Sequence, residues 1–128
     1  MIRRLAPMGL AALIALCGCA APRNTLGTRS SACFRSLPTA RSAVHHEGHL
    51  LGVRRVSRDT VLRAFPQADL PPGHDFCVVG FSGKYKAENV DHPAGAPEGR
   101  DAVVIVTMRG TTVVRTFLVD RLPLRLRH

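Results

Sequence analysis

Two neighbouring runs of β-branched and apolar residues constrain the fold of this chain more than any other feature. Residues 102–108, AVVIVTM, form the most strand-like segment, and residues 112–119, TVVRTFLV, follow closely. Arg109, Gly110 and Thr111 make the short, glycine-containing connection that is typical of a hairpin. The pattern therefore predicts two paired antiparallel strands. The core positions expected from this hairpin are Val103, Ile105, Val113 and Phe117.

Three further segments have the apolar spacing of strands. Residues 49–56 and 75–82 each predict one strand, the second of them buried. Residues 83–100 contain Gly, Pro and mixed charges and predict a long loop. At the C-terminus, Leu residues alternate with Arg over residues 121–128, which predicts a last edge strand because Pro123 bars it from a central position. The alternative for this tail is a basic amphipathic segment for lipid headgroups or strand addition.

Two short helices complete the expected architecture. Apolar residues at helical spacing predict a helix that begins near Leu37, with Pro38 in its first turn, and ends at Gly48. Ser57 is suited to cap a second helix over residues 58–65. The fold class predicted is α+β: a small antiparallel sheet of about four strands with one or two helices on one face, in the order α-β-α-β-β-β.

The first residues of the chain have the pattern of an export signal. Arg3 and Arg4 precede an uncharged, mostly apolar stretch over residues 8–16. This stretch is shorter than the ~20 residues of a membrane-spanning helix, and Pro7 lies just before it. The segment therefore predicts a cleaved signal peptide.

Residues 16–19, Leu-Cys-Gly-Cys, resemble the lipobox of bacterial lipoproteins, and this resemblance covers residues 1–20 alone. It implies that Cys19 becomes the mature N-terminus and carries a diacylglyceryl thioether. The protein would then be anchored by lipid in the cell membrane or outer membrane, outside the cytoplasm. The alternative is an ordinary signal cut after Ala21. The expected organisation is a signal peptide over 1–18, a flexible tether over 19–32 and one α+β domain over 33–128.

Maturation would leave two of the four cysteines in the folded part. Cys17 leaves with the signal and Cys19 is consumed by lipidation, so Cys33 and Cys77 remain in an oxidising compartment. Both have apolar neighbours in the sequence. We expect a disulfide between them, with buried free thiols or a redox-active thiol as the alternatives.

The chain is strongly basic, with 18 Lys and Arg against 9 Asp and Glu. Loss of Arg3 and Arg4 with the signal changes the formal net charge from +9 to +7. Arg predominates over Lys, which reflects either base composition or a role for guanidinium groups in binding phosphate or carboxylate. Export argues against nucleic acid as the partner and favours anionic lipid or a wall polymer. The residues expected to bind such a surface are Arg54, Arg55, Arg121, Arg125 and Arg127.

One cluster has the residue types of a metal site. His45, His46 and His49 lie within five positions, together with Glu47, and imidazole ligands would favour zinc or copper. The alternative is a polar helix end and turn, where His near a helix C-terminus is favourable by itself.

Candidate catalytic groups are scattered. His74-Asp75 and Asp91-His92 could each supply a base and its orienting carboxylate, but the sequence identifies no activated nucleophile. We therefore expect a non-catalytic binding or scaffolding protein of the cell envelope that uses no cofactor. A small envelope enzyme and a metal-binding protein remain the alternatives.

Overall fold

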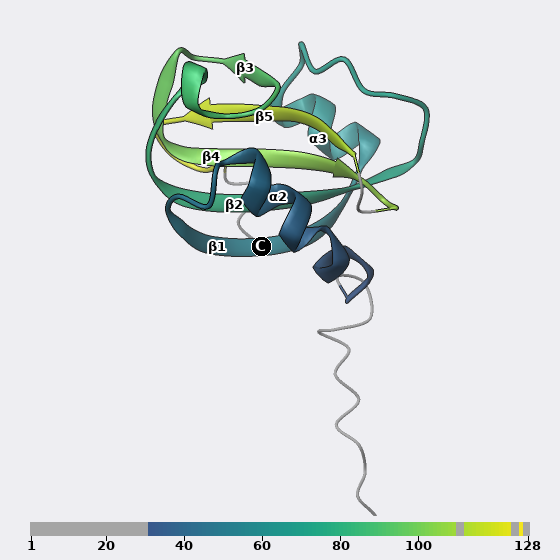
Figure 1. Ribbon diagram of the computed structural model, residues 1–128. Coiled ribbons are helices and arrows are strands. Elements are labelled where there is room, and N and C mark those ends of the chain that lie inside the picture. Colours follow the sequence, from purple (N-terminus) through teal and green to yellow (C-terminus); the bar gives the residue numbers. More distant parts are fainter. Residues whose placement is uncertain (1–30, 110–111, 124–125, 127–128) are drawn as a thin grey trace, which may run out of the picture.

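The computed structural model describes residues 31–109, 112–123 and 126, and its core is one five-stranded sheet with helices packed against it (Figure 1). Two 3-10 helices and two α-helices accompany the strands. The elements in chain order are η1 (Ser31–Ser36), α2 (Leu37–Ala43), β1 (His49–Ser57), α3 (Arg58–Ala64), β2 (Asp75–Lys86), η2 (Ala87–Asn89), β3 (Pro93–Gly95), β4 (Glu98–Thr107) and β5 (Val113–Val119). The α+β class is confirmed.

The sheet has the strand order β1-β2-β4-β5-β3, so that β1 and β3 form its edges. All neighbouring strands are antiparallel except β3 and β5, which run parallel. The four longer strands pair antiparallel as expected, and the difference from the expectation is the fifth strand, β3, which is additional and pairs parallel. The additional strand, β3, is three residues long, and Pro93 begins it at an edge where a missing backbone N–H is tolerated.

Side chains of the sheet are buried on both faces. Four consecutive residues of β4, Val103–Val106, are fully buried, and they alternate between the two faces. The face that carries Val104 and Val106, called the α2 face, is covered by η1 and α2, and the other, called the α3 face, is covered by α3 (Figure 1). Leu122 and Leu126 also pack on the α3 face. Helices on one face alone, as we expected, would leave half of these apolar side chains in water.

The predicted hairpin is confirmed. β4 and β5 pair antiparallel, with Val103 opposite Phe117, and both side chains are buried. Ile105 is also fully buried, while Val113 is partly buried against the core.

The predicted helices are present with altered limits. Ser57 caps α3, because its side chain accepts a hydrogen bond from the backbone N–H of Thr60. α2 begins at Leu37 as predicted but ends at Ala43, before Gly48. His45 and His46 both have left-handed backbone conformations, with φ of 54° and 62°, and these reverse the chain where a longer helix was expected.

The expected loop over residues 83–100 is largely structured. β2 continues to Lys86, and η2, β3 and the start of β4 follow within the same segment. The C-terminal segment also differs from the expectation, since its described residues, 120–123 and 126, are not in a strand. Leu122 and Leu126 instead pack against the α3 face of the sheet.

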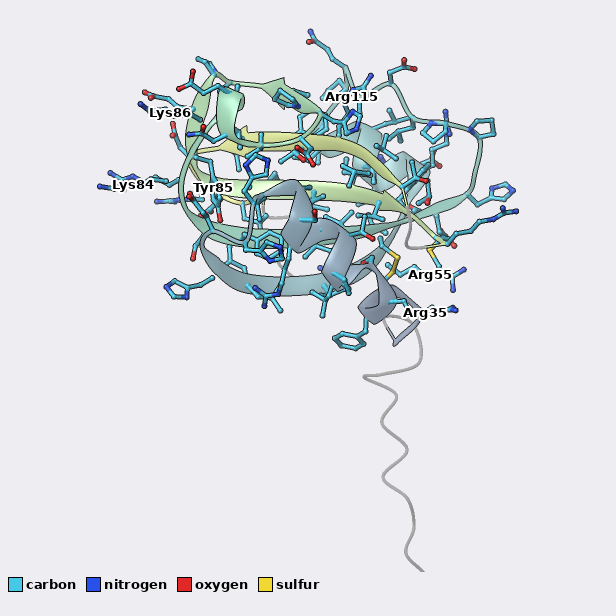
Figure 2. All side chains as sticks on the ribbon, viewed as in Figure 1. Arg35, Arg55, Lys84, Tyr85, Lys86 and Arg115 are labelled. Carbon is cyan, nitrogen blue, oxygen red and sulfur yellow. A yellow bond between two sulfur atoms is a disulfide. The ribbon has the colours of Figure 1, made fainter. Side chains whose placement is uncertain are left out.

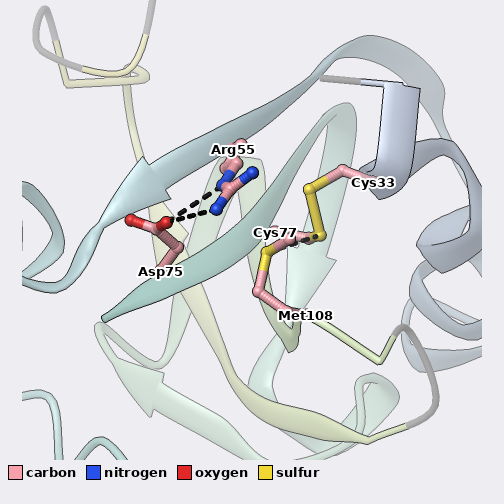
Figure 3. Close-up of polar contacts among 5 residues, drawn as sticks. All are labelled: Cys33, Arg55, Asp75, Cys77 and Met108. Carbon is pink, nitrogen blue, oxygen red and sulfur yellow. Dashed lines mark hydrogen bonds and ion pairs between the residues drawn. A yellow bond between two sulfur atoms is a disulfide. The ribbon is translucent and has the colours of Figure 1, made fainter. Parts of the chain in front are cut away.

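Cys33 and Cys77 form a disulfide, with their Cα atoms 5.3 Å apart, as predicted (Figure 3). Both residues are fully buried and belong to the core on the α2 face. The bond ties η1 to the beginning of β2. Met108 adds to this contact, because its Sδ atom lies 3.7 Å from Cys77 Sγ.

Candidate functional site

Two facing glycines open a hollow in the α3 face of the sheet. Gly52 of β1 lies directly opposite Gly80 of β2. A Cβ atom on Gly52 would meet no atom within 4 Å, and one on Gly80 would lie 3.5 Å from the Leu122 side chain. Because neighbouring strands lack side chains at the same position, the sheet face is recessed here.

The space above the two glycines has a volume of about 340 Å³. We call it the Arg54 hollow. Apolar side chains from the sheet and the C-terminal segment form most of its walls, and one basic and one acidic residue complete it. Its lining residues are Leu51, Gly52, Arg54, Val78, Gly80, Asp101, Leu122 and Leu126.

Arg54 brings to this hollow a guanidinium group with one buried nitrogen that has no partner. It follows Gly52 by two residues, so the pleat of β1 places both on the same face of the sheet. Its Nη1 atom is inaccessible to solvent and has no hydrogen-bond partner. A buried donor on a charged group without a partner is costly. An anion bound beside Arg54 would compensate this charge.

Asp101 lies toward the other end of the hollow. On β2, Val78 is the partner of Arg54, whereas Ser82 is the partner of Asp101. Four residues of strand separate these positions, or about 13 Å. Asp101 Oδ2 accepts a hydrogen bond from the backbone N–H of Leu122, at 3.1 Å, and this contact holds the C-terminal segment over the sheet.

Arg55 belongs to the opposite face of the sheet, although it follows Arg54 directly. Its Nε and Nη2 atoms donate to Asp75 Oδ2 at 3.0 and 2.7 Å (Figure 3). Consecutive residues of a strand point to opposite faces, so the Arg54–Arg55 pair cannot act on one surface. Arg55 also differs from Arg54 because it already has a carboxylate partner in Asp75.

Within the described residues, the predicted surface arginines do not form one patch. Arg54 and Arg55 diverge, Arg121 is exposed beyond the end of β5, and Arg125 and Arg127 lie outside the described residues. Positive charge is instead dispersed. Figure 2 shows Lys84 and Lys86 at one end of the sheet, Arg35 and Arg55 near each other at the opposite end, and Arg115 apart from both groups.

The predicted metal ligands diverge as well. His45 Nε2 lies 3.2 Å from Asp91 Oδ1, while His46 is exposed and His49 begins β1 opposite Ser82. Within the residues that the structure describes, no group of three or more His, Cys, Asp or Glu side chains is placed to hold a metal ion.

The two candidate acid–base pairs are engaged elsewhere. The carboxylate of Asp75 binds Arg55, and that of Asp91 contacts His45.

Tyr85 is buried, and its hydroxyl donates to the backbone carbonyl of Glu47 at 2.8 Å. Burial raises the pKa of the Tyr85 phenol, and the nearby negative charges of Glu47 and Asp101 add to this effect.

The Arg54 hollow was not predicted from the sequence. Arg54 was selected for its charge, without its pocket, and the glycine pair was missed. A glycine within a strand pattern is a signal of a bulge or a close approach, and Gly52 follows a register shift at Leu51. Pairing Gly52 with Gly80 required the register of β1 on β2, which the residue pattern does not specify.

Comparison with known proteins gives no match: neither a family model, nor a curated protein, nor a solved structure is significantly similar to this chain. Among the helices that the structure describes, none has the length and apolar character to cross a membrane.

Proposed function

We propose that this chain is a lipid-anchored protein of the cell envelope that binds, without catalysis, a ligand combining an anionic group with an apolar group. The Arg54 hollow is the binding site. The observation that carries this proposal is the buried, unpartnered Nη1 of Arg54 beside a recess with apolar walls.

The anchor part of the proposal rests on residues 1–20, with Cys19 as the lipid-bearing residue. The disulfide supports export in general, because a bond between Cys33 and Cys77 persists in an oxidising compartment. Two or three acyl chains would hold the protein stably at a membrane surface.

The chemistry of the hollow selects the ligand class. A guanidinium group binds carboxylate or phosphate through paired hydrogen bonds. The side chains of Leu51, Val78, Leu122 and Leu126 would cover an apolar group next to it. A volume of about 340 Å³ is within the range of small-ligand sites. Anionic lipids and acidic segments of proteins both combine these two chemistries.

The test is calorimetric titration of the purified full chain with decanoate and decyl phosphate. Decyltrimethylammonium, which has the same tail and a cationic head, is the ligand control. Because charge-assisted hydrogen bonds contribute about 1.5–3 kcal/mol, Arg54→Gln should weaken binding of the anionic probes by about tenfold or more.

Arg35→Gln is the matched control variant, since it removes an equal charge from exposed Arg35 in η1, on the other face of the sheet (Figure 2). It should leave binding unchanged. Equal binding by the wild-type and Arg54→Gln proteins, or equal binding of the cationic probe, would contradict the proposal.

A further inference from the structure

We infer that the ligand of the Arg54 hollow is an extended acidic segment of a partner protein, which pairs with β1 as an added strand. This inference rests on the proposed function and names the ligand class of the same site. In outline, the edge of β1 would bind the peptide backbone, and the hollow would select two of its side chains.

β1 is placed to accept a strand. It is nine residues long and forms one edge of the sheet, with β2 as its strand partner. No other strand of the described residues pairs with its outer side. An unpaired strand edge presents backbone donors and acceptors that an extended peptide can use. The bulge at Leu51 interrupts regular pairing, so Gly52–Ser57 is the part of β1 available for it.

The hollow lies directly beside this edge. Gly52 and Arg54 both line it, and they are two residues apart on the same face of β1. Alternate residues of an added strand would also share that face. A large apolar side chain opposite Gly52 can lean into the recess, while an Asp or Glu two positions away can reach Arg54. The recognised pattern is therefore an apolar residue and an acidic residue separated by one position.

One exposed apolar residue extends the proposed contact. The Leu50 and Leu51 side chains are 37% and 49% exposed at the start of β1, and they are among the three large apolar side chains that the described part leaves exposed. Leu51 lines the hollow, so a strand docked beside Gly52 would cover part of this side chain, whereas Leu50, opposite Phe81, lies on the α2 face.

Charge favours an acidic partner protein at the β1 edge over a second copy of the chain or its own residues 1–30. In an antiparallel pairing with a second copy centred on Arg54, the two Arg54 side chains would face each other, and like charges across neighbouring strands are unfavourable. Residues 1–30 contain no Asp or Glu and so cannot neutralise Arg54. The formal net charge, +9 for the full chain and +7 without Arg3 and Arg4, also favours an acidic partner.

The test uses a fluorescent nine-residue peptide of alternating Thr and Val that carries one Leu and, two positions away, one Asp, in both orders. Anisotropy with the full chain measures affinity, and hydrogen exchange reports protection of the β1 amides. We expect binding with new protection within Gly52–Ser57. Replacing the peptide Asp with Lys, or methylating alternate peptide nitrogens, should each weaken binding by about tenfold or more.

The outcomes separate this inference from the proposed function. If decanoate binds through Arg54 but the peptide binds no better than its methylated form, the strand inference is overturned and the proposed function stands. Arg54-dependent binding to phosphatidylglycerol vesicles, without peptide binding, would identify a membrane as the ligand. A dimer in sedimentation that the peptide dissociates would show that a second copy covers β1. If no probe binds, both proposals fail.

Discussion

Gly52 faces Gly80 across the β1–β2 pair, and Arg54, two residues further along β1, adjoins the space that these two glycines leave. The recess is therefore created by missing side chains. Glycine in a strand weakens it by roughly 0.5–1 kcal/mol, so this pair has a cost in stability that ligand binding would explain.

Gly52→Val should raise the melting temperature of the protein and abolish binding of decanoate in the Arg54 hollow. The position has open space for a side chain and no left-handed backbone requirement, and valine favours strands by up to about 1 kcal/mol. Thermal melting and decanoate calorimetry measure the two effects. Gly48→Ala is the contrasting variant: Gly48 has φ of 88° and lies against Tyr85, so it should lower stability without affecting the hollow. Unchanged ligand affinity in Gly52→Val would place the binding site elsewhere.

Removal of the disulfide should cost much of the stability. Cys33 and Cys77 are separated by 44 positions, and closing such a loop contributes about 4 kcal/mol in the chain-entropy model. Urea unfolding of the double variant Cys33→Ala/Cys77→Ala should show this loss. A reductant should shift the wild-type curve in the same direction and leave the double variant unaffected. Coinciding unfolding curves for oxidised and reduced wild-type protein would contradict the prediction.

Tyr85 should make stability fall at high pH. Its pKa is raised above the ordinary value of 10.0 by burial and by the charges of Glu47 and Asp101. The protonated phenol is favoured in the folded state, so this contribution is present below pH 10 and is lost as pH rises through the folded-state pKa. Tyr85→Phe should flatten this dependence while losing the hydrogen bond to Glu47. Ultraviolet absorbance follows the chain's one tyrosine directly, and a native titration at or below the unfolded one would refute the assignment.

Cys19→Ser should release the protein from the membrane fraction, because a hydroxyl cannot form the thioether to lipid. Cys17→Ser is the matched control and should stay membrane-bound. Intact-mass measurement of the wild-type protein should show a chain beginning at Cys19 with added acyl mass. A mature chain beginning at Pro22 without acyl groups would instead show an ordinary secretory signal.

Local patterns predicted the local structure well. The runs of β-branched and apolar residues on either side of Arg109 predicted the β4–β5 hairpin, and Ser57 predicted the start of α3. β3 escaped prediction because Pro93, Ala94 and Gly95 have no strand preference and pair only where β5 provides an edge. The formation of β3 therefore depends on its contact with β5, which lies further along the chain.

Prediction of the candidate site required contacts between residues far apart in the sequence to a greater degree than prediction of the strands and helices did. Pleat alternation alone implies that Arg54 and Arg55 face opposite ways, and the sequence was sufficient for that inference. Predicting the hollow would have required the register of β1 on β2 and the packing of Leu122 and Leu126 against the α3 face of the sheet. The Leu-Arg alternation predicted an edge strand there, but apolar cover for the α3 face determined where these leucines lie.

An anionic ligand that binds beside Arg54 should change the magnetic environment of the hollow. Nuclear magnetic resonance titration of the full chain with decanoate measures this change residue by residue. We expect saturable shifts of the Arg54 Nε–H signal and of the Gly52 and Gly80 amides, with the Arg35 Nε–H signal unmoved. Binding that leaves the Arg54, Gly52 and Gly80 signals in place would contradict this expectation.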